Sequence, residues 1–321
     1  MRYFVRRGLT YIAVFLAVLN ITFFLPRMVP GNAAQILASS SHLSAQDTAI
    51  ISARLGLNLP LSGQYFAYLK NIFLTWPPYF GVSYAYYPAT VTDIFASRII
   101  WTLLLILSSL VFTLFLTYAI GAYSSLRRGG KFEMGSLYSS IVLNSVPTFW
   151  FGMILLLIFA IIYRIFPIFG NLSFNPGTGF DYAWDVIWHA LLPIITLGLM
   201  FTAQNYLLLR GSMQEVLNSD YVVAAKLRGL SGWRVSSGYI LRNSLLPLIS
   251  VLSFSIAGLI SRVILVEVVF GYSGVGDLLV DAVLGHDYPV IEGSFFYLSL
   301  IVIAGGIIGD IVLKKLDPRI E

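Results

Sequence analysis

Long apolar runs constrain the fold of this chain more than any other feature. Residues 99–123 form one such run, without a single Asp, Glu, Lys or Arg. A helix that crosses a bilayer needs about 20 largely apolar residues. The whole chain is 58% hydrophobic and 11% charged, whereas soluble domains are about 25% charged. The sequence therefore predicts a membrane protein.

Six runs are long enough to span a membrane, at about 9–29, 99–123, 135–163, 188–209, 246–270 and 293–313. The basic residues before the first run are also typical of a signal peptide. However, the run is longer than a signal-peptide core and no small-residue cleavage pattern follows it, so we interpret it as a retained anchor. Pro147 is expected to kink the third span, because it removes a backbone donor. These patterns predict an all-α polytopic membrane protein with about six transmembrane helices.

The basic residues predict the orientation, with both termini in the cytoplasm. The N-terminus, the loops 124–134 and 210–245 and the C-terminus hold 14 of the 20 Lys and Arg residues, as the positive-inside rule requires of cytoplasmic segments. These are Arg2, Arg6, Arg7, Arg127, Arg128, Lys131, Arg210, Lys226, Arg228, Arg234, Arg242, Lys314, Lys315 and Arg319.

This topology divides the chain into four segments. Residues 1–30 form a cytoplasmic tail and the first helix, and residues 31–97 form an extracytoplasmic insertion. Residues 98–314 form a core of five helices, which includes the cytoplasmic loop 210–245 and the outer segment 271–292. Residues 315–321 form a cytoplasmic tail.

The outer segments contain short helices and many aromatic residues. In the insertion, the capping pattern "SAQD" at 44–47 predicts one helix, and residues 64–73 predict another. The stretch "TWPPYFGVSYAYYP" at 75–88 is suited either to the membrane–water interface or to docking of an external protein. In segment 271–292, Leu278, Leu279, Ala282 and Val283 share one helical face. That helix lies at the interface or forms a re-entrant gate.

The loop 210–245 predicts two short helices. Tyr221, Ala224, Ala225 and Arg228 recur at helical spacing, Gly229 ends the first helix in the left-handed conformation, and Leu230 lies in the turn. This pattern is also typical of a DNA-binding helix-turn-helix in a membrane-anchored signalling protein. Because the loop is tethered to spans at both ends, docking onto another protein is the favoured interpretation. The small residues Ala224 and Ala225 would permit close approach to that partner.

No pattern for enzymatic chemistry or a metal site emerges. Phe132 follows Gly130-Lys131 where a nucleotide-binding loop needs Ser or Thr, and the three histidines lie far apart in the sequence. Arg262 and Glu267 lie within or near the fifth span, where charges are expensive and often functional. They are about 140° apart around a helix, so they are poor partners for each other. Arg262 either lines a water-filled path or pairs with another span or subunit.

Several ordered motifs resemble one protein family. Residues 223–229, "VAAKLRG", resemble the "EAA…G" signature of the inner-membrane permease subunits of ATP-binding-cassette importers, with Val223 in place of the signature Glu. "LGLNLPLSGQY", "SVPTFWFGM", "VEVVFGYSGVGDLLVDAVLGHDYPVIEG" and "LDPRI" are similar to motifs of the dipeptide/oligopeptide (Dpp/Opp-type) branch. The resemblance covers nearly the whole chain.

The resemblance implies the type I importer transmembrane fold and a multi-pass protein of the inner membrane. It implies a second homologous permease, two cytoplasmic ATPase subunits and an extracytoplasmic substrate-binding protein as partners, with no nucleic acid. The chain would bind no cofactor, since ATP and Mg²⁺ would bind to the ATPases. In the family, the segment that matches 221–230 is the coupling helix that docks on an ATPase. Peptides are the implied cargo, and oligosaccharides and nickel are the alternatives within this branch.

Overall fold

A computed structural model describes residues 2–28, 53, 58–127 and 129–316. These residues form helices joined by turns and loops, and among them the only strand-like pairing is an isolated bridge between Val82 and Thr90. Most of the predicted insertion before residue 58, including the pattern at 44–47, lies outside the described residues, as does the end of the tail from residue 317. The chain divides into two compact units.

Four described helices are long and apolar enough to cross a membrane. They are Arg7–Met28 within α1 (Arg2–Met28), α5 (Val91–Leu126), α8 (Phe180–Leu217) and Tyr288–Ile311 within α13 (Tyr288–Leu316). They match the first, second, fourth and sixth predicted spans, and the helix α11 (Arg242–Val269) matches the fifth. The predicted all-α polytopic architecture is thus confirmed.

The third predicted span is broken rather than kinked. It consists of α6 (Lys131–Asn144), then α7 (Thr148–Leu155) and the π-helical segment η1 (Leu156–Ile162), with a bend of 105° between α6 and the following pair. Pro147 adopts φ −61° and ψ 136° at the break. A proline cannot donate a backbone hydrogen bond, and it disfavours helical conformation in the residue before it. The prediction of a kink in one continuous helix was therefore wrong in degree.

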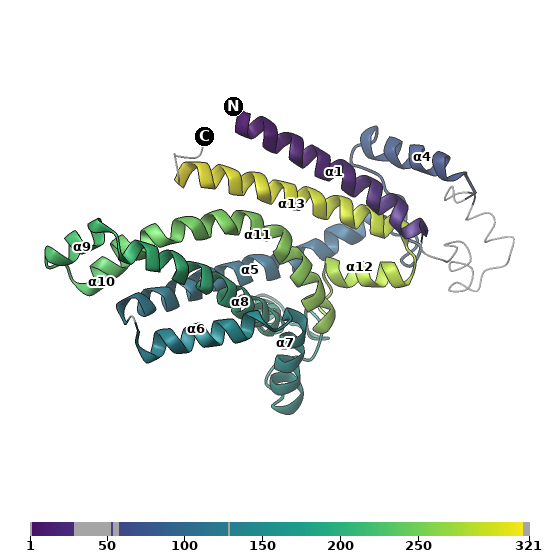
Figure 1. Cartoon of the computed structure of the whole chain (residues 1–321). Coiled ribbons are helices and arrows are strands. Elements are labelled where there is room, and N and C mark those ends of the chain that lie inside the picture. Colours follow the sequence, from purple (N-terminus) through teal and green to yellow (C-terminus); the bar gives the residue numbers. More distant parts are fainter. Residues whose placement is uncertain (1, 29–52, 54–57, 128, 317–321) are drawn as a thin grey trace. The chain divides into compact units, whose positions relative to one another are not determined.

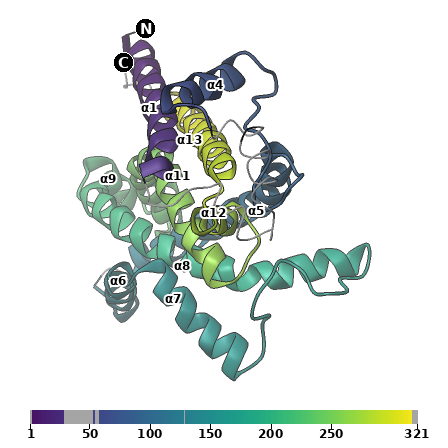
Figure 2. The ribbon, with the colours of Figure 1, turned by 90° about the vertical axis from the view of Figure 1, so that its right-hand side faces the viewer.

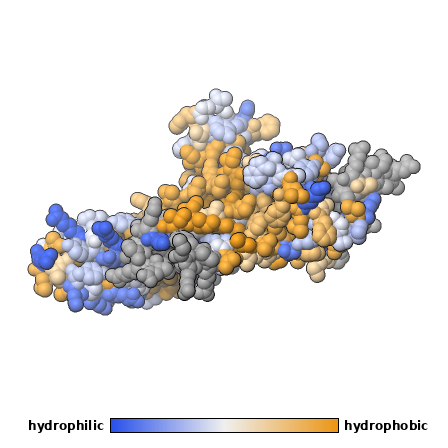
Figure 3. All heavy atoms as spheres, turned by 90° about the horizontal axis from the view of Figure 1, so that it is seen from above, coloured by the Kyte–Doolittle hydropathy of each residue, from blue (hydrophilic) through white to orange (hydrophobic). Residues whose placement is uncertain are grey.

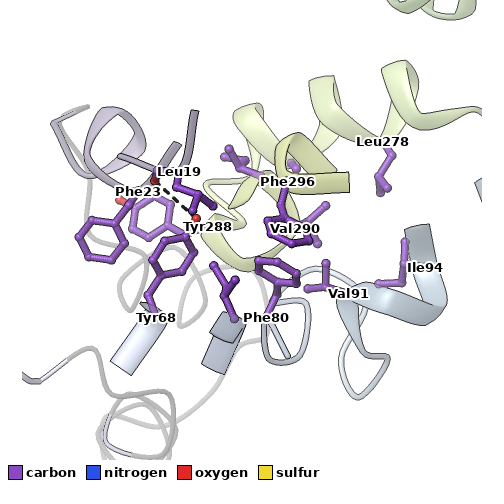
Figure 4. Packing of buried hydrophobic residues seen from close by; sticks show 13 residues of the cluster. Leu19, Phe23, Tyr68, Phe80, Val91, Ile94, Leu278, Tyr288, Val290 and Phe296 are labelled. Atoms are coloured by element: carbon purple, nitrogen blue, oxygen red, sulfur yellow. Dashed lines mark hydrogen bonds between the residues drawn. The ribbon is translucent and has the colours of Figure 1, made fainter. Parts of the chain in front are cut away.

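Unit 1 comprises Met1–Ile100 and Gly274–Ala304. It contains α1, α4 (Leu61–Phe73), α12 (Val275–Leu284) and the first parts of α5 and α13. Figures 1 and 2 show α4 beside α1. The core of unit 1 gathers Leu19 and Phe23 of α1, Tyr68 of α4, and residues of α5, α12 and α13 (Figure 4).

Unit 2 comprises Trp101–Ser273 and Gly305–Glu321. Its central helix is α8, which contacts α6, α7, α11, α9 (Asp220–Leu227) and the π-helical segment η2 (Ser236–Leu241). Close packing needs small residues in places: a Cβ at Gly198 of α8 would overlap the ring of Phe112 of α5. Residues 232–269 form one uninterrupted helical path, from α10 (Gly232–Val235) through η2 into α11.

Candidate functional site

The short helix α9 ends in a defined C-terminal cap. Only Asn218 and Ser219 separate it from α8. At its other end the N–H of Gly229 donates to the carbonyl of Lys226 at 2.9 Å, and the N–H of Leu230 donates to the carbonyl of Ala225 at 3.4 Å. This pair of bonds is a Schellman motif, in which the residue after the cap is left-handed. Gly229 has φ +71°, so the predicted helix stop at Gly229 is confirmed.

The inner face of α9 is anchored in unit 2. Val222 is fully buried and Ala225 is 3% exposed. They pack in a cluster with Leu209 of α8, Val235 of α10 and Leu241 of η2, and Leu230 packs against the same cluster. Ala225 thus faces the chain's own core and not a partner, in contrast to the expectation that both alanines permit close approach from outside. The same contacts therefore pack α8, α10 and η2 together and hold α9 in place.

The outer face of α9 is exposed and carries apolar residues at its centre. Val223, Ala224 and Leu227 are exposed at helical spacing, with exposed Tyr221 and Arg228 on one flank, Lys226 on the other and Asp220 in the first turn. Leu227 is 83% exposed. Figure 3 shows hydrophilic residues around the end of unit 2 that carries α9 and α10. An apolar strip with a polar surround is typical of a protein-docking surface, and Val223, in the position of the signature Glu, makes this strip more apolar.

Polar contacts fix the helices beneath α9. Arg210 Nε of α8 donates to Glu133 Oε1 of α6 at 2.9 Å, and the N–H of Gly129 donates to Glu133 Oε2 at 2.6 Å. Ser236 Oγ of η2 contacts Ser125 Oγ of α5. Arg210 was predicted only as a marker of orientation. Its pairing with Glu133 was missed, because the two residues are 77 positions apart.

The structure places Arg262 and Glu267 against different helices of unit 2. The guanidinium carbon of Arg262 lies 4.7 Å from the ring centroid of Phe201 of α8, a cation–π contact. Glu267 is fully buried, and its Oε1 accepts a hydrogen bond from Thr102 Oγ1 of α5 at 2.7 Å. The prediction that the two charges are not partners of each other agrees with these contacts. Arg262 and Glu267 lie in α11 and not in α9, so they form a separate candidate site.

The outer segment of unit 1 is held by a buried carboxylate. Asp287 Oδ2 accepts hydrogen bonds from the N–H groups of Tyr84 at 2.9 Å and Ala85 at 3.1 Å, and from Ser83 Oγ. Its Oδ1 accepts from the N–H of Val290 in the first turn of α13 at 3.4 Å. This side chain therefore ties the aromatic segment 75–88 to α13, a role that sequence reasoning missed.

The predicted amphipathic helix in this segment is α12. Leu278, Leu279 and Ala282 are buried as expected, whereas Val283 is exposed, so its predicted place on the inner face was wrong. Val283 lies about 100° from Ala282 around the helix, at the edge of the buried face. Burial, followed by the nearby Asp281 carboxylate, raises the pKa of Asp277 on the same helix.

A charge pair of one partly exposed and one buried residue lies in unit 1. Arg27 Nη1 of α1 forms an ion pair with Glu292 Oε1 of α13 and also donates to the carbonyl of Phe23 at 2.7 Å. Its Nε donates to Gln64 Oε1 of α4 at 3.2 Å. The signal for this site was a lone arginine at the end of the first apolar run, but no local pattern identifies Glu292 as its partner.

Comparison with known families and proteins gives a consistent result over the whole chain. Residues 117–321 match the family described as "Binding-protein-dependent transport system inner membrane component", and residues 1–98 match the N-terminal family of such membrane components. The dipeptide transport system permease protein DppB of Escherichia coli (strain K12) is 29% identical, over 100% of this chain and 99% of that protein.

Two further relatives are similar over almost their full length. The oligopeptide transport system permease protein AppB of Bacillus subtilis (strain 168) is 31% identical over 99% of both chains. The di/tripeptide transport system permease protein DppB of Pseudomonas aeruginosa (strain UCBPP-PA14) is 30% identical over 97% of this chain and 96% of that protein. With its multi-pass helical architecture, the chain belongs to the family of inner membrane components of binding-protein-dependent transport systems.

Proposed function

We propose that this chain is the permease subunit of a peptide importer driven by ATP. The relatives named above are permeases of dipeptide, di/tripeptide and oligopeptide transport systems, and they cover essentially the whole chain. Family membership also favours transport over the alternative of a membrane-anchored DNA-binding protein. The full assembly would contain a second homologous permease, two ATPase subunits and an extracytoplasmic binding protein. ATP and Mg²⁺ would bind to the ATPases, and this chain would have no catalytic role of its own.

The coupling role is proposed for α9. The observation that carries it is the division of α9 into a buried face, with Val222 and Ala225, and an exposed apolar face around Leu227. The first face fixes the helix to α8, α10 and η2, and the second is free to enter a groove on an ATPase. A displacement of the ATPase would then move these helices as a block. Tyr221, Ala224 and Arg228 would contact the ATPase directly, while Gly229 and Leu230 hold the helix end.

For Arg262 and Glu267 we propose a role in the translocation path or in pairing between the two permeases. A buried carboxylate is costly in a membrane helix and is often functional. Glu267 is fully buried and accepts a hydrogen bond from Thr102 Oγ1. When the helices rearrange, this carboxylate would become available to a cationic group, such as the ammonium group of a peptide.

The cargo is tested with the complete transporter in lipid vesicles. The readout is ATP hydrolysis stimulated by the cognate binding protein with peptides, an oligosaccharide or Ni²⁺. We expect stimulation by peptides. Stimulation by the oligosaccharide or Ni²⁺ alone would refute the peptide assignment and leave the coupling role of α9 standing.

The coupling role is tested by cross-linking. The chain has no cysteine, so Leu227→Cys introduces a unique thiol in this subunit, to which a maleimide-linked photoreactive group is attached. We expect a photoproduct with the ATPase subunit. The matched control is Leu284→Cys, at the exposed last residue of α12, which should give none. Equal yields from the two positions would contradict the assignment.

A further inference from the structure

The helix α4 lies beside the membrane-spanning part of α1. Tyr65 of α4 stacks on Phe24 with ring centroids 5.3 Å apart, and its hydroxyl donates to Asn20 Oδ1 at 2.8 Å. Tyr68 OH donates to the carbonyl of Leu19 at 3.5 Å, as Figure 4 shows. The apolar part of α1 ends at Met28, about 14 Å beyond Leu19 at about 1.5 Å per residue. Since the hydrocarbon layer is about 30 Å thick, α4 lies level with its outer part.

The side chains that α4 directs outward suit this depth. Phe66 and Phe73 are exposed on one face, with exposed Lys70 between them. The following residues Leu74 and Trp76 are also exposed, Trp76 by 92%. Large apolar side chains around one lysine are typical of helices that lie in the membrane interface. In water this surface would be an aggregation-prone patch, whereas beside α1 it meets lipid.

An apolar groove opens on this surface within unit 1. Its volume is about 530 Å³, within the range of about 300–1,000 Å³ that is usual for ligand sites. Its walls are made by side chains of α1, of α13 and of the segment 72–78, which include Phe15, Phe296, Leu300, Ile72, Leu74 and Trp76. The rings of Phe15 and Phe296 lie 5.5 Å apart.

We propose that the groove holds an acyl chain of a phospholipid of the outer leaflet. The groove continues the lipid-facing sides of two membrane spans, because Leu300 of its wall on α13 is exposed, as is Leu16 of α1 next to the wall residue Phe15. Water cannot stabilise such a lining. The segment 72–76 is thus a lipid site and not a docking surface for an external protein.

The test uses the complete transporter in vesicles of phosphatidylethanolamine and phosphatidylglycerol, with a tracer phospholipid that carries a photoreactive group on its acyl chain. Mass spectrometry of the irradiated protein locates the labelled residues. We expect labels on residues 72–76 and around Leu300. Leu300→Trp fills the groove and should reduce labelling of 72–76 at least fivefold. The control Ile308→Trp, at an exposed position of the same helix outside the groove, should leave it unchanged.

Two outcomes would overturn the proposal. One is that the photoreactive lipid labels α5 of the wild-type protein but not residues 72–76. The other is cross-linking of residues 72–76 to the added extracytoplasmic binding protein in place of lipid. Neither outcome depends on peptide-stimulated ATP hydrolysis, so failure of the lipid site and failure of the proposed transport function are distinguishable.

Discussion

Truncation of Leu227 should weaken ATPase docking without affecting the fold. The side chain is 83% exposed, so Leu227→Ala removes little from the core of unit 2. Replacing the isobutyl group by methyl removes roughly three methylene equivalents, each contributing about 0.8 kcal/mol when buried. If docking buries the exposed part, the loss is about 2 kcal/mol, or about 30-fold in affinity.

The assay is binding of the isolated ATPase subunit to the permease pair in lipid nanodiscs, with the thermal unfolding temperature as a check on folding. Leu284→Ala is the matched control, since Leu284 is 75% exposed and also ends a short helix, α12. It should bind the ATPase as the wild type does. An affinity of Leu227→Ala within threefold of the wild type, at an unchanged unfolding temperature, would refute the docking role of this face.

Three further predictions concern stability. Gly229→Ala should cost roughly 1–2 kcal/mol in unfolding experiments, because φ +71° is strained for a residue with a Cβ; an unchanged unfolding temperature would contradict the Schellman cap. Arg27→Met should cost about 3–5 kcal/mol because it leaves the buried Glu292 unpaired, Glu292→Leu should cost less because Arg27 is partly exposed, and the double variant should recover most of the loss; additive losses would argue against direct pairing. Burial, and then the Asp281 carboxylate, raise the pKa of Asp277 above its usual value of 3.8. The folded protein therefore binds this proton more tightly than the unfolded chain does. The resulting stabilisation is fully present below the usual value and is lost as the pH rises through the raised pKa. Asp277→Asn should flatten this pH dependence of the unfolding temperature, and an unchanged profile would exclude Asp277 as its source.

Much of the fold follows from local patterns in the sequence. The apolar runs identify the spanning helices because each run reports its own length and hydropathy. Gly229 identifies the end of α9 because glycine favours the left-handed conformation. The angle at Pro147 does not follow in the same way. Proline predicts an interruption, whereas the 105° bend also depends on how α6 and α7 pack on α8.

The directions of small side chains and the pairing of distant charges were not predictable. Ala224 and Ala225 are equally suited to an outer or an inner face of a two-turn helix. Only the neighbouring Leu209 and Val235, which come from other elements, decide that Ala225 faces inward. Arg27 and Glu292 are 265 positions apart, so a single sequence gives no local signal that joins them.

The two faces of α9 have a consequence for engineering. Two separate sets of side chains divide the tasks of this helix. One set holds the helix in place, and a partner would touch the other. The recognition set around Val223 and Leu227 could therefore be exchanged for that of another transporter without rebuilding the core on which Val222 rests. If α9 docks as proposed, substitutions confined to its eight residues should redirect the permease to the ATPase subunit of another transporter.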